Sequence, residues 1–252
     1  DMGASRRGVH MGPAAIRHAD LHEKLDALGL QWRDSGDIIP VAKAETHDNM
    51  KNFDAIVDAN RRLYEATLAS LSEGFTPVVL GGDHSIAAGS IPAVAQFYGE
   101  IGVIWVDAHG DFNDSDSSES GNMHGMPFSA VRGCLPEAMV PFASTFVNPG
   151  KCVQIGARDV DLKERQRLKE AGVTVFPITE IDKVGIARVV EDAIGIASDG
   201  TKGIHVSFDI DVVTPDEAPG VGTPVHSGLT VREAFLLAEM LYESQRLLAL
   251  DM

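Results

Sequence analysis

Apolar residues follow two alternating patterns along the chain. Short runs of four to six mostly aliphatic residues predict strands, at residues 76–80, 101–106, 152–155, 173–176 and 204–208. Around these runs, apolar residues spaced three and four apart predict helices, at residues 13–28, 48–72, 86–98, 161–170, 184–196 and 231–242. Apolar strands that alternate with helices are typical of a parallel sheet covered on both faces, so the pattern predicts an α/β fold.

Acidic and histidine residues gather directly after three of the predicted strands, in the stretches Gly81–His84, Asp107–Asp111 and Asp209–Asp211. In open α/β sheets ligands bind outside the carboxyl ends of the strands, so stretches far apart in sequence can meet at one edge. Alternate residues of an extended segment share one face, which groups the side chains further. Carboxylates and imidazoles without thiolates favour Mn, Mg, Fe or Zn, and a carboxylate-rich pair of ions favours manganese. The candidate metal ligands are His84, Asp107, His109, Asp111, Asp209 and Asp211.

Each of these aspartates alone has a structural interpretation, because an aspartate after a strand commonly caps a helix or a turn. Convergence of the four aspartates changes this view. At ~5 Å and an effective dielectric of ~20, each like-charge pair repels by roughly 3 kcal/mol. The total, on the order of 20 kcal/mol, exceeds the stability of a typical domain, so convergence requires protonation or cations. Two divalent ions would balance the four carboxylates, and they could activate a shared water molecule near neutral pH.

Composition narrows the class of protein. The 252 residues suit one domain with a sizeable core, and no stretch approaches the roughly 18 apolar residues of a membrane span. The net charge of -16 disfavours nucleic acid and anionic membranes as partners, and it suits a cationic small substrate or simply an acidic enzyme. The two cysteines, Cys134 and Cys152, are too few for a disulfide framework, so we expect a reducing cytoplasm.

The chain also starts and stops abruptly. It begins with Asp1 instead of Met and ends in an apolar run, 248–252, that has the pattern of a strand. We therefore expect residues 1–252 to form a single domain that is incomplete at both ends, with a first strand and a C-terminal segment missing.

A polar loop, residues 112–127, follows the central ligand stretch. Such a segment is commonly a solvated loop, but its position beside the candidate ligands favours contact with a substrate. Asn113 and Ser120 could hold a carboxylate through neutral hydrogen bonds. His124 could carry a proton or serve as a seventh metal ligand, and spacing does not decide between these roles.

A second loop, residues 220–229, contains Thr223 and leads into the last predicted helix. Thr230 and Glu233 at its start have the spacing of a capping box, which is the structural interpretation of Glu233. The alternative is a carboxylate that faces a cationic group of the substrate. The physical pattern alone favours the cap.

Four motifs, in order and in spacing, closely resemble those of the ureohydrolases, also called the arginase/agmatinase family. They are G-G-D-H-S at 81–85, V-D-A-H-G-D at 106–111, S-G-N-M-H-G at 120–125 and S-F-D-I-D at 207–211. The resemblance runs from Arg6 to the end of the chain. It implies a three-layer α/β/α sandwich around a mostly parallel sheet and a site with two Mn²⁺ ions. It also implies attack of a metal-bridging hydroxide on a guanidinium carbon, with release of urea and an amine.

Within the family, the opening segment 6–17 is similar to that of the bacterial arginases, which implies L-arginine as substrate and L-ornithine and urea as products. The bacterial relatives also imply a homo-oligomer, either a hexamer or a trimer. The same resemblance implies that all six candidate ligands bind metal, Asp107 and Asp209 being shared, and it assigns further roles. The substrate's α-carboxylate would be bound by Asn113, Ser120 and Asn122, and its α-amino group by Asp161. Thr223 would also contact the substrate, and Glu233 would lie beside the guanidinium as a catalytic group. His124 would act as the proton shuttle, and Asp111 would be both a metal ligand and a catalytic group.

Two alternatives remain open at this point. The chain could be another enzyme of the family, an agmatinase, guanidinobutyrase or formimidoylglutamase. It could also be a catalytically silent member that binds metal without turnover, although the presence of all six ligands argues against that.

Overall fold

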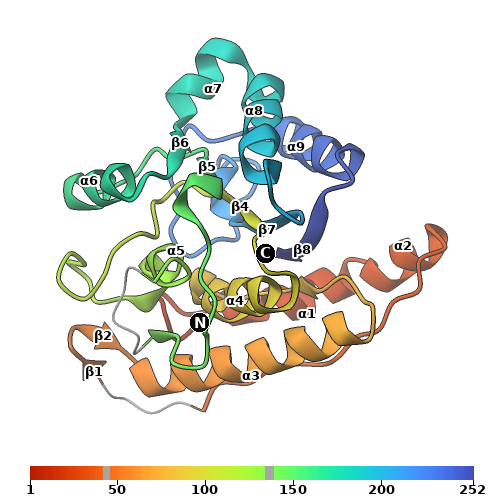
Figure 1. Cartoon of the computed structure of the whole chain (residues 1–252), viewed down its shortest axis with the longest axis horizontal. Coiled ribbons are helices and arrows are strands. Elements are labelled where there is room, and N and C mark those ends of the chain that lie inside the picture. Colours follow the sequence, from red (N-terminus) through yellow and green to blue (C-terminus); the bar gives the residue numbers. More distant parts are fainter. Residues whose placement is uncertain (42–45, 134–138) are drawn as a thin grey trace.

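The computed structural model describes residues 1–41, 46–133 and 139–252. Its centre is a six-stranded sheet with the order β3-β8-β7-β4-β5-β6, and every strand pair within it is parallel (Figure 1). The strands are β3 (Val78–Val79), β4 (Gly102–Val106), β5 (Cys152–Ile155), β6 (Thr174–Phe176), β7 (Ile204–Phe208) and β8 (Leu247–Asp251). The predicted α/β fold with a parallel sheet is confirmed. Cys152 is buried in β5, whereas Cys134 lies outside the described residues.

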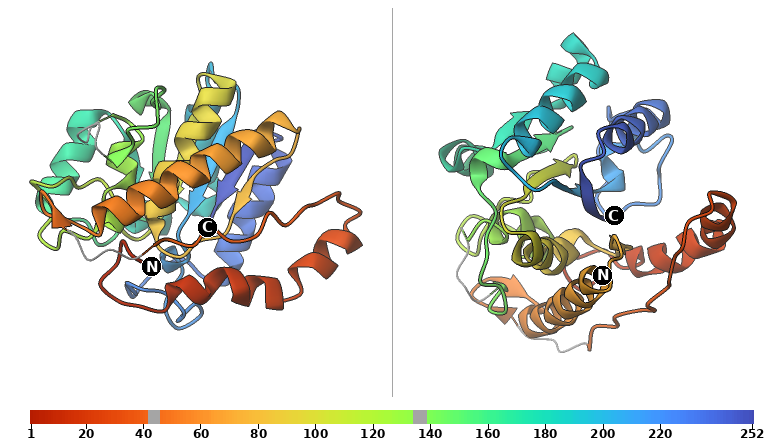
Figure 2. Two further views of the ribbon diagram at one scale, coloured as in Figure 1. Left: turned by 90° about the horizontal axis from the view of Figure 1, so that it is seen from below. Right: turned by 45° about the vertical axis from the view of Figure 1, so that its right-hand side comes forward.

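Helices cover both faces of the sheet (Figures 1 and 2). On one face lie α3 (Phe53–Ser72), α4 (Ala87–Tyr98), α5 (Pro127–Ala130) and α6 (Leu162–Ala171), and on the other α7 (Ile178–Val184), α8 (Ile186–Ser198) and α9 (Val231–Glu243). Strand β4 shows why two layers of helices are needed. Its Val103 and Trp105 pack in the core that contains α4, while Ile104 and Val106 pack with α8 and α9. Because successive side chains point to opposite faces, an all-apolar strand must be buried on both.

The first predicted helix, 13–28, is wrong in one respect, because the structure divides it into α1 (Gly12–His18) and α2 (Leu21–Ala27). Asp20 between them has a φ of 60°, in the left-handed region that interrupts a helix. Neither short helix contains a buried residue, so no core contact holds them in a single line.

Two other helix boundaries differ from the pattern. Helix α3 begins at Phe53, not at 48, because Asn52 is left-handed and the preceding residues form a hairpin of β1 (Thr46–His47) and β2 (Met50–Lys51). The predicted helix 184–196 is α8 alone, and α7 before it was not predicted; Gly185, with a φ of 84°, separates the two. Asn and Gly tolerate the left-handed conformation, which periodicity of apolar residues does not report.

The sheet brings the three ligand stretches to one edge. Strand β7 lies beside β4, and β8 separates β7 from β3, so all three carboxyl ends lie along the same edge within four adjacent strands. Short 3-10 helices follow two of these strand ends: η2 (His84–Ile86) follows β3, and η6 (Ile210–Val212) follows β7. Further 3-10 helices in the described residues are η1 (Val9–Met11), η3 (Met123–Gly125) and η5 (Pro149–Lys151). In the part of the chain that the structure describes, no helix combines the length and the apolar character needed to cross a membrane.

Candidate metal centre

The side chains that follow β3, β4 and β7 form two overlapping groups of possible metal ligands within the described ranges. One group is His84, Asp107 and Asp111, and the other is Asp107, His109 and Asp211. In each group the three ligand atoms lie within 4.8 Å of one another. Asp107 belongs to both groups, so two ions could lie side by side with this carboxylate between them.

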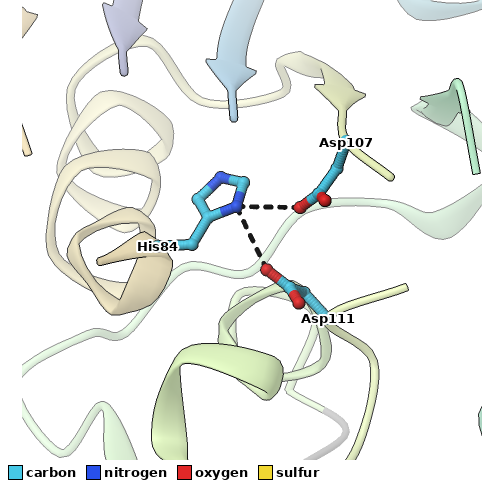
Figure 3. A group of neighbouring side chains, drawn as sticks. All are labelled: His84, Asp107 and Asp111. Carbon is cyan, nitrogen blue, oxygen red and sulfur yellow. Dashed lines mark hydrogen bonds and ion pairs between the residues drawn. The ribbon is translucent and has the colours of Figure 1, made fainter. Parts of the chain in front are cut away.

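The first group centres on one nitrogen of His84 (Figure 3). The Nδ1 atom lies 2.9 Å from Asp107 Oδ2 and 3.1 Å from Asp111 Oδ2, and Asp209 Oδ2 lies 3.4 Å away. The imidazole stacks on the indole ring of Trp105, with 4.0 Å between the ring centres. The indole Nε1 donates to Asp107 Oδ2 at 3.0 Å, so Trp105 orients both a histidine and a carboxylate of this group.

The second group is built around His109. Its Nδ1 atom lies 3.0 Å from Asp211 Oδ2 and 3.4 Å from Asp107 Oδ1. The Thr223 hydroxyl donates to the same oxygen of Asp211 at 3.1 Å, which ties the 220–229 loop to the group. Arg158 adds a second tie, since its Nη2 atom donates to the carbonyl oxygens of Asp211 and Val225 at 2.7 Å each.

Two of the aspartates also shape the backbone. Asp107 Oδ1 accepts from the His109 N–H at 2.7 Å, and Asp209 Oδ1 accepts from the Asp211 N–H at 2.9 Å. Each bond turns the chain just after its strand. In both residues the other oxygen, Oδ2, points at His84. The structural and the functional interpretations of these aspartates therefore hold together. Asp209 uses one oxygen for the turn and the other for the cluster, whereas Asp107 Oδ1 makes the turn and also lies 3.4 Å from His109 Nδ1.

Burial and repulsion between the carboxylates shift the pKa values of the aspartates in the cluster. Burial and the charge of Asp107 raise the pKa of Asp111 well above its usual range, and burial with the charges of Asp107 and Asp209 raises the pKa of Asp211 to about 7. Burial would also raise the pKa of Asp107, but hydrogen bonds from His109 and His84 hold it well below the usual range.

The two histidines show the opposite response. Burial alone would lower the pKa of each imidazole. The carboxylates around them reverse this, so the pKa of His84 lies well above its usual range and that of His109 is raised to about 12. Without ions, imidazolium groups balance the cluster. Divalent cations would supply the same positive charge and leave the Nδ1 atoms as neutral ligands, so the residues present fit a metal centre with two ions.

The remaining predicted residues lie around this cluster. His124 is half-buried in η3, and burial together with the charge of His109 lowers its pKa, so its imidazole is neutral at pH 7. Asp161 is exposed and directly precedes α6. Ser120 is exposed, with its hydroxyl accepting from the Asn122 N–H at 3.2 Å, and Asn122 Oδ1 accepts from the Ser5 hydroxyl at 2.9 Å.

Glu233 takes part in the capping box that its spacing predicts. The Thr230 hydroxyl accepts from the Glu233 N–H at 3.2 Å, and the Glu233 carboxylate accepts from the Thr230 N–H at 2.8 Å. The cap is therefore confirmed. A role of Glu233 beside a guanidinium group stays a prediction.

Glu164 is an important residue that sequence reasoning missed. It is buried in α6, and its Oε1 atom accepts from the Phe112 N–H at 2.8 Å and from Asn113 Nδ2 at 3.2 Å. Gly110 lies so close that a Cβ atom there would clash with the Glu164 carboxyl group. Glu164 thus holds the loop that carries the central ligands. The sequence carries only a weak signal for this, the apolar residue Leu168 four positions later on the same helix face.

Comparison with known proteins agrees with this geometry. A family model described as the arginase family matches residues 1–252. The arginase of Bacillus caldovelox is 43% identical over 252 residues, covering 97% of this chain and 84% of that protein. The arginase of Brevibacillus brevis is 45% identical over 249 residues, covering 97% and 83%. The native structure of the Bacillus caldovelox arginase has a TM-score of 0.96 at 41% identity, covering all of this chain and 86% of that one.

Proposed function

The chain belongs to the arginase family, and from this premise we propose that it hydrolyses L-arginine to L-ornithine and urea. The single observation that carries the proposal is the pair of ligand groups joined at Asp107, found in a chain that is similar to arginases over nearly its whole length. A hydrolase that attacks a guanidinium carbon needs an activated water molecule, and a two-ion site is one way to provide it.

Two Mn²⁺ ions are the cofactor we propose. One would be held by His84, Asp107 and Asp111, and the other by Asp107, His109 and Asp211. Asp209, which faces His84, would complete the set as a second shared ligand. When bound, the ions would lower the pKa of a water molecule and so supply hydroxide near neutral pH.

Residues outside the cluster would orient the substrate and move its proton. We assign the α-carboxylate to Asn113, Ser120 and Asn122, which lie in the 112–127 loop after the central ligands, and the α-amino group to Asp161, which directly precedes α6. His124 can accept a proton and pass it to the leaving amine, because its lowered pKa keeps the imidazole neutral near pH 7.

Thr223 would act indirectly. Its hydroxyl is already engaged with Asp211, so it positions that carboxylate and the adjoining loop beside the substrate. Asp111 would be a ligand and also a catalytic group, since its buried carboxylate faces His84 within the cluster. We further propose a homo-oligomer, a hexamer or a trimer, that acts in the cytoplasm. The resemblance to bacterial arginases supports both points.

A substrate panel tests the proposal. Urea release from L-arginine is measured with added Mn²⁺ and after chelation, beside agmatine, 4-guanidinobutyrate and formimidoylglutamate. We expect urea from L-arginine, loss of activity on chelation and recovery with Mn²⁺. Preference for agmatine or 4-guanidinobutyrate, or release of formamide, would assign the chain to another enzyme of the family. Binding of two ions without any turnover would make it a silent metal-binding member.

A double variant tests how the substrate is recognised. Asn113→Ala with Ser120→Ala should raise the KM for L-arginine and leave the KM for agmatine nearly unchanged, because agmatine has no α-carboxylate. The two KM values are measured on the same metal-loaded preparation. An equal rise for both substrates would show that these residues maintain the loop instead of binding the carboxylate.

A further inference from the structure

A buried chain of hydrogen bonds runs from His84 in the direction away from the ligand groups. The Nε2 atom of His84 lies 2.8 Å from Ser207 Oγ, and the Ser207 hydroxyl donates to Asp251 Oδ1 at 2.5 Å. Ser207 in β7 and Asp251 in β8 are register partners in neighbouring parallel strands. Both are fully buried, so water does not compete for these bonds.

Asp251 is the acceptor at the end of this chain. Besides the Ser207 hydroxyl, its carboxylate accepts from the Ser90 hydroxyl at 2.6 Å and bonds with His205 Nε2 at 2.7 Å. Burial alone would raise the pKa of Asp251, but the hydrogen bond and charge of His205, the charge of His84 and the hydrogen bond from Ser207 hold it below its usual range. The residue is therefore an ionised carboxylate in a fully buried position.

An ionised carboxylate can only accept hydrogen bonds, and this sets the direction of the whole chain. The Ser207 hydroxyl must give its hydrogen to Asp251, so its oxygen is left to accept from the N–H at His84 Nε2. A neutral imidazole carries a hydrogen on one ring nitrogen and a lone pair on the other. With the hydrogen at Nε2, the lone pair lies at Nδ1, the atom that faces Asp107 and Asp111.

We propose that Asp251, acting through Ser207, fixes the hydrogen of His84 on Nε2 and so keeps Nδ1 available to bind the ion of the first ligand group. Asp251 and Ser207 are positioning residues, because neither faces the ion. Stacking on Trp105 sets the plane of the imidazole but leaves its tautomer open, so it cannot replace this role. Partners of this kind on metal-binding histidines typically matter 10–100-fold in affinity.

Loss of Asp251 or Ser207 is predicted to weaken the binding of only one of the two ions. His109, in the second group, has Asp159 Oδ2 at 3.9 Å from its Nε2 atom, and its Nδ1 atom faces Asp211 and Asp107. It has no part in the bonds that join His84, Ser207 and Asp251. Loss of this hydrogen-bond chain should therefore weaken the ion at His84 and spare the ion at His109.

Two variants test the inference with Mn²⁺ as the only ligand. Asp251→Asn keeps the shape, but its amide can donate to Ser207 Oγ, which lets the hydroxyl hydrogen turn toward His84 Nε2 and favours the wrong tautomer. Ser207→Ala removes the acceptor outright and serves if the first variant does not fold. Ser90→Ala is the matched control, since it also removes a buried hydroxyl bond to Asp251 but leaves the bond to His84 in place.

The measurements are calorimetric titration with Mn²⁺ and the number of ions retained after gel filtration. For the unaltered chain and Ser90→Ala we expect two retained ions per chain. For Asp251→Asn and Ser207→Ala we expect one, with the affinity of the other ion lowered about 10–100-fold. Unchanged binding in both variants would overturn the inference, as would equal weakening of both ions or an equal effect of Ser90→Ala.

This inference rests on the proposed metal site but is independent of the proposed substrate. Binding is measured without any guanidino compound, so a chain that holds two ions and fails to hydrolyse L-arginine would refute the activity and leave the inference standing. Failure of the unaltered chain to bind two ions would refute the metal site itself.

Discussion

Glu164→Gln is the substitution whose effect on stability follows most directly from the structure. The carboxyl group is buried in α6 and accepts from the Phe112 N–H and the Asn113 side chain. Burial, the largest effect, raises its pKa from 4.5 to about 7. Gln has nearly the same shape and can accept the same two bonds, but it cannot ionise. The substitution therefore isolates the cost of burying a charge behind the ligand loop.

The size of the effect follows from linkage between protonation and folding. In the unfolded chain Glu164 loses its proton near pH 4.5, whereas in the folded chain it keeps the proton until about pH 7. The contribution of Glu164 to stability is therefore largest below pH 4.5 and is lost as the pH rises to about 7. The difference between the two pKa values corresponds to about 3 kcal/mol. Gln removes this loss, while weaker hydrogen bonds cost the variant roughly 1 kcal/mol at every pH.

The free energy of unfolding should thus cross over between the two proteins. At pH 5 the variant should be slightly less stable than the unaltered chain, and at pH 8 it should be more stable by about 2 kcal/mol. Urea denaturation from pH 5 to pH 8, with a chelator present to keep the site free of ions, measures both curves. Other titrating groups cancel in the difference.

Glu170→Gln is the matched control, because Glu170 is exposed on the same helix. Its curve should run parallel to that of the unaltered chain. Parallel curves for Glu164→Gln as well would refute the reasoning, since they would mean that Glu164 is ionised at the same pH in the folded and unfolded chains.

Two further substitutions separate roles that the sequence left open. His124→Asn should lower kcat for L-arginine at least 10-fold with two ions still bound, as expected of a proton carrier; metal analysis that shows a lost ion would make His124 a ligand. Glu233→Ala should lower the free energy of unfolding by about 1 kcal/mol through loss of the capping box, and it should also lower kcat/KM for L-arginine through loss of the carboxylate predicted beside the guanidinium. An unchanged kcat/KM with the same loss of stability would restrict Glu233 to the cap.

Local patterns predicted the strands well because an apolar run buried on both faces is a feature of a few consecutive residues. The run 101–106 corresponds closely to β4 (Gly102–Val106), and 204–208 is β7. Helix ends were harder to predict. Asp20 and Asn52 end or delay helices by adopting left-handed backbone, and such single conformations depend on tertiary contacts more than on periodicity.

The partners of the ligands escaped prediction for a different reason. Glu164 lies in a highly charged helix, where a glutamate is ordinarily solvated, and only its packing against Gly110 shows that it is buried. Asp251 ends strand β8 without any motif around it. Its partner Ser207 lies 44 residues away in sequence. No local spacing signals a contact of that kind.

The sequence by itself determined which chemical groups are available at the edge of the sheet. The residues that follow each strand are a local property, and parallel strands all end on the same side. Only the tertiary structure decided which atoms meet. The order β3-β8-β7-β4 lets His84, which follows β3, reach Asp107 after β4 and Asp209 after β7, and Ser207 links it to Asp251 at the end of β8. Strand order and register arise from packing of the whole sheet against its helices, so no segment of the chain specifies them alone.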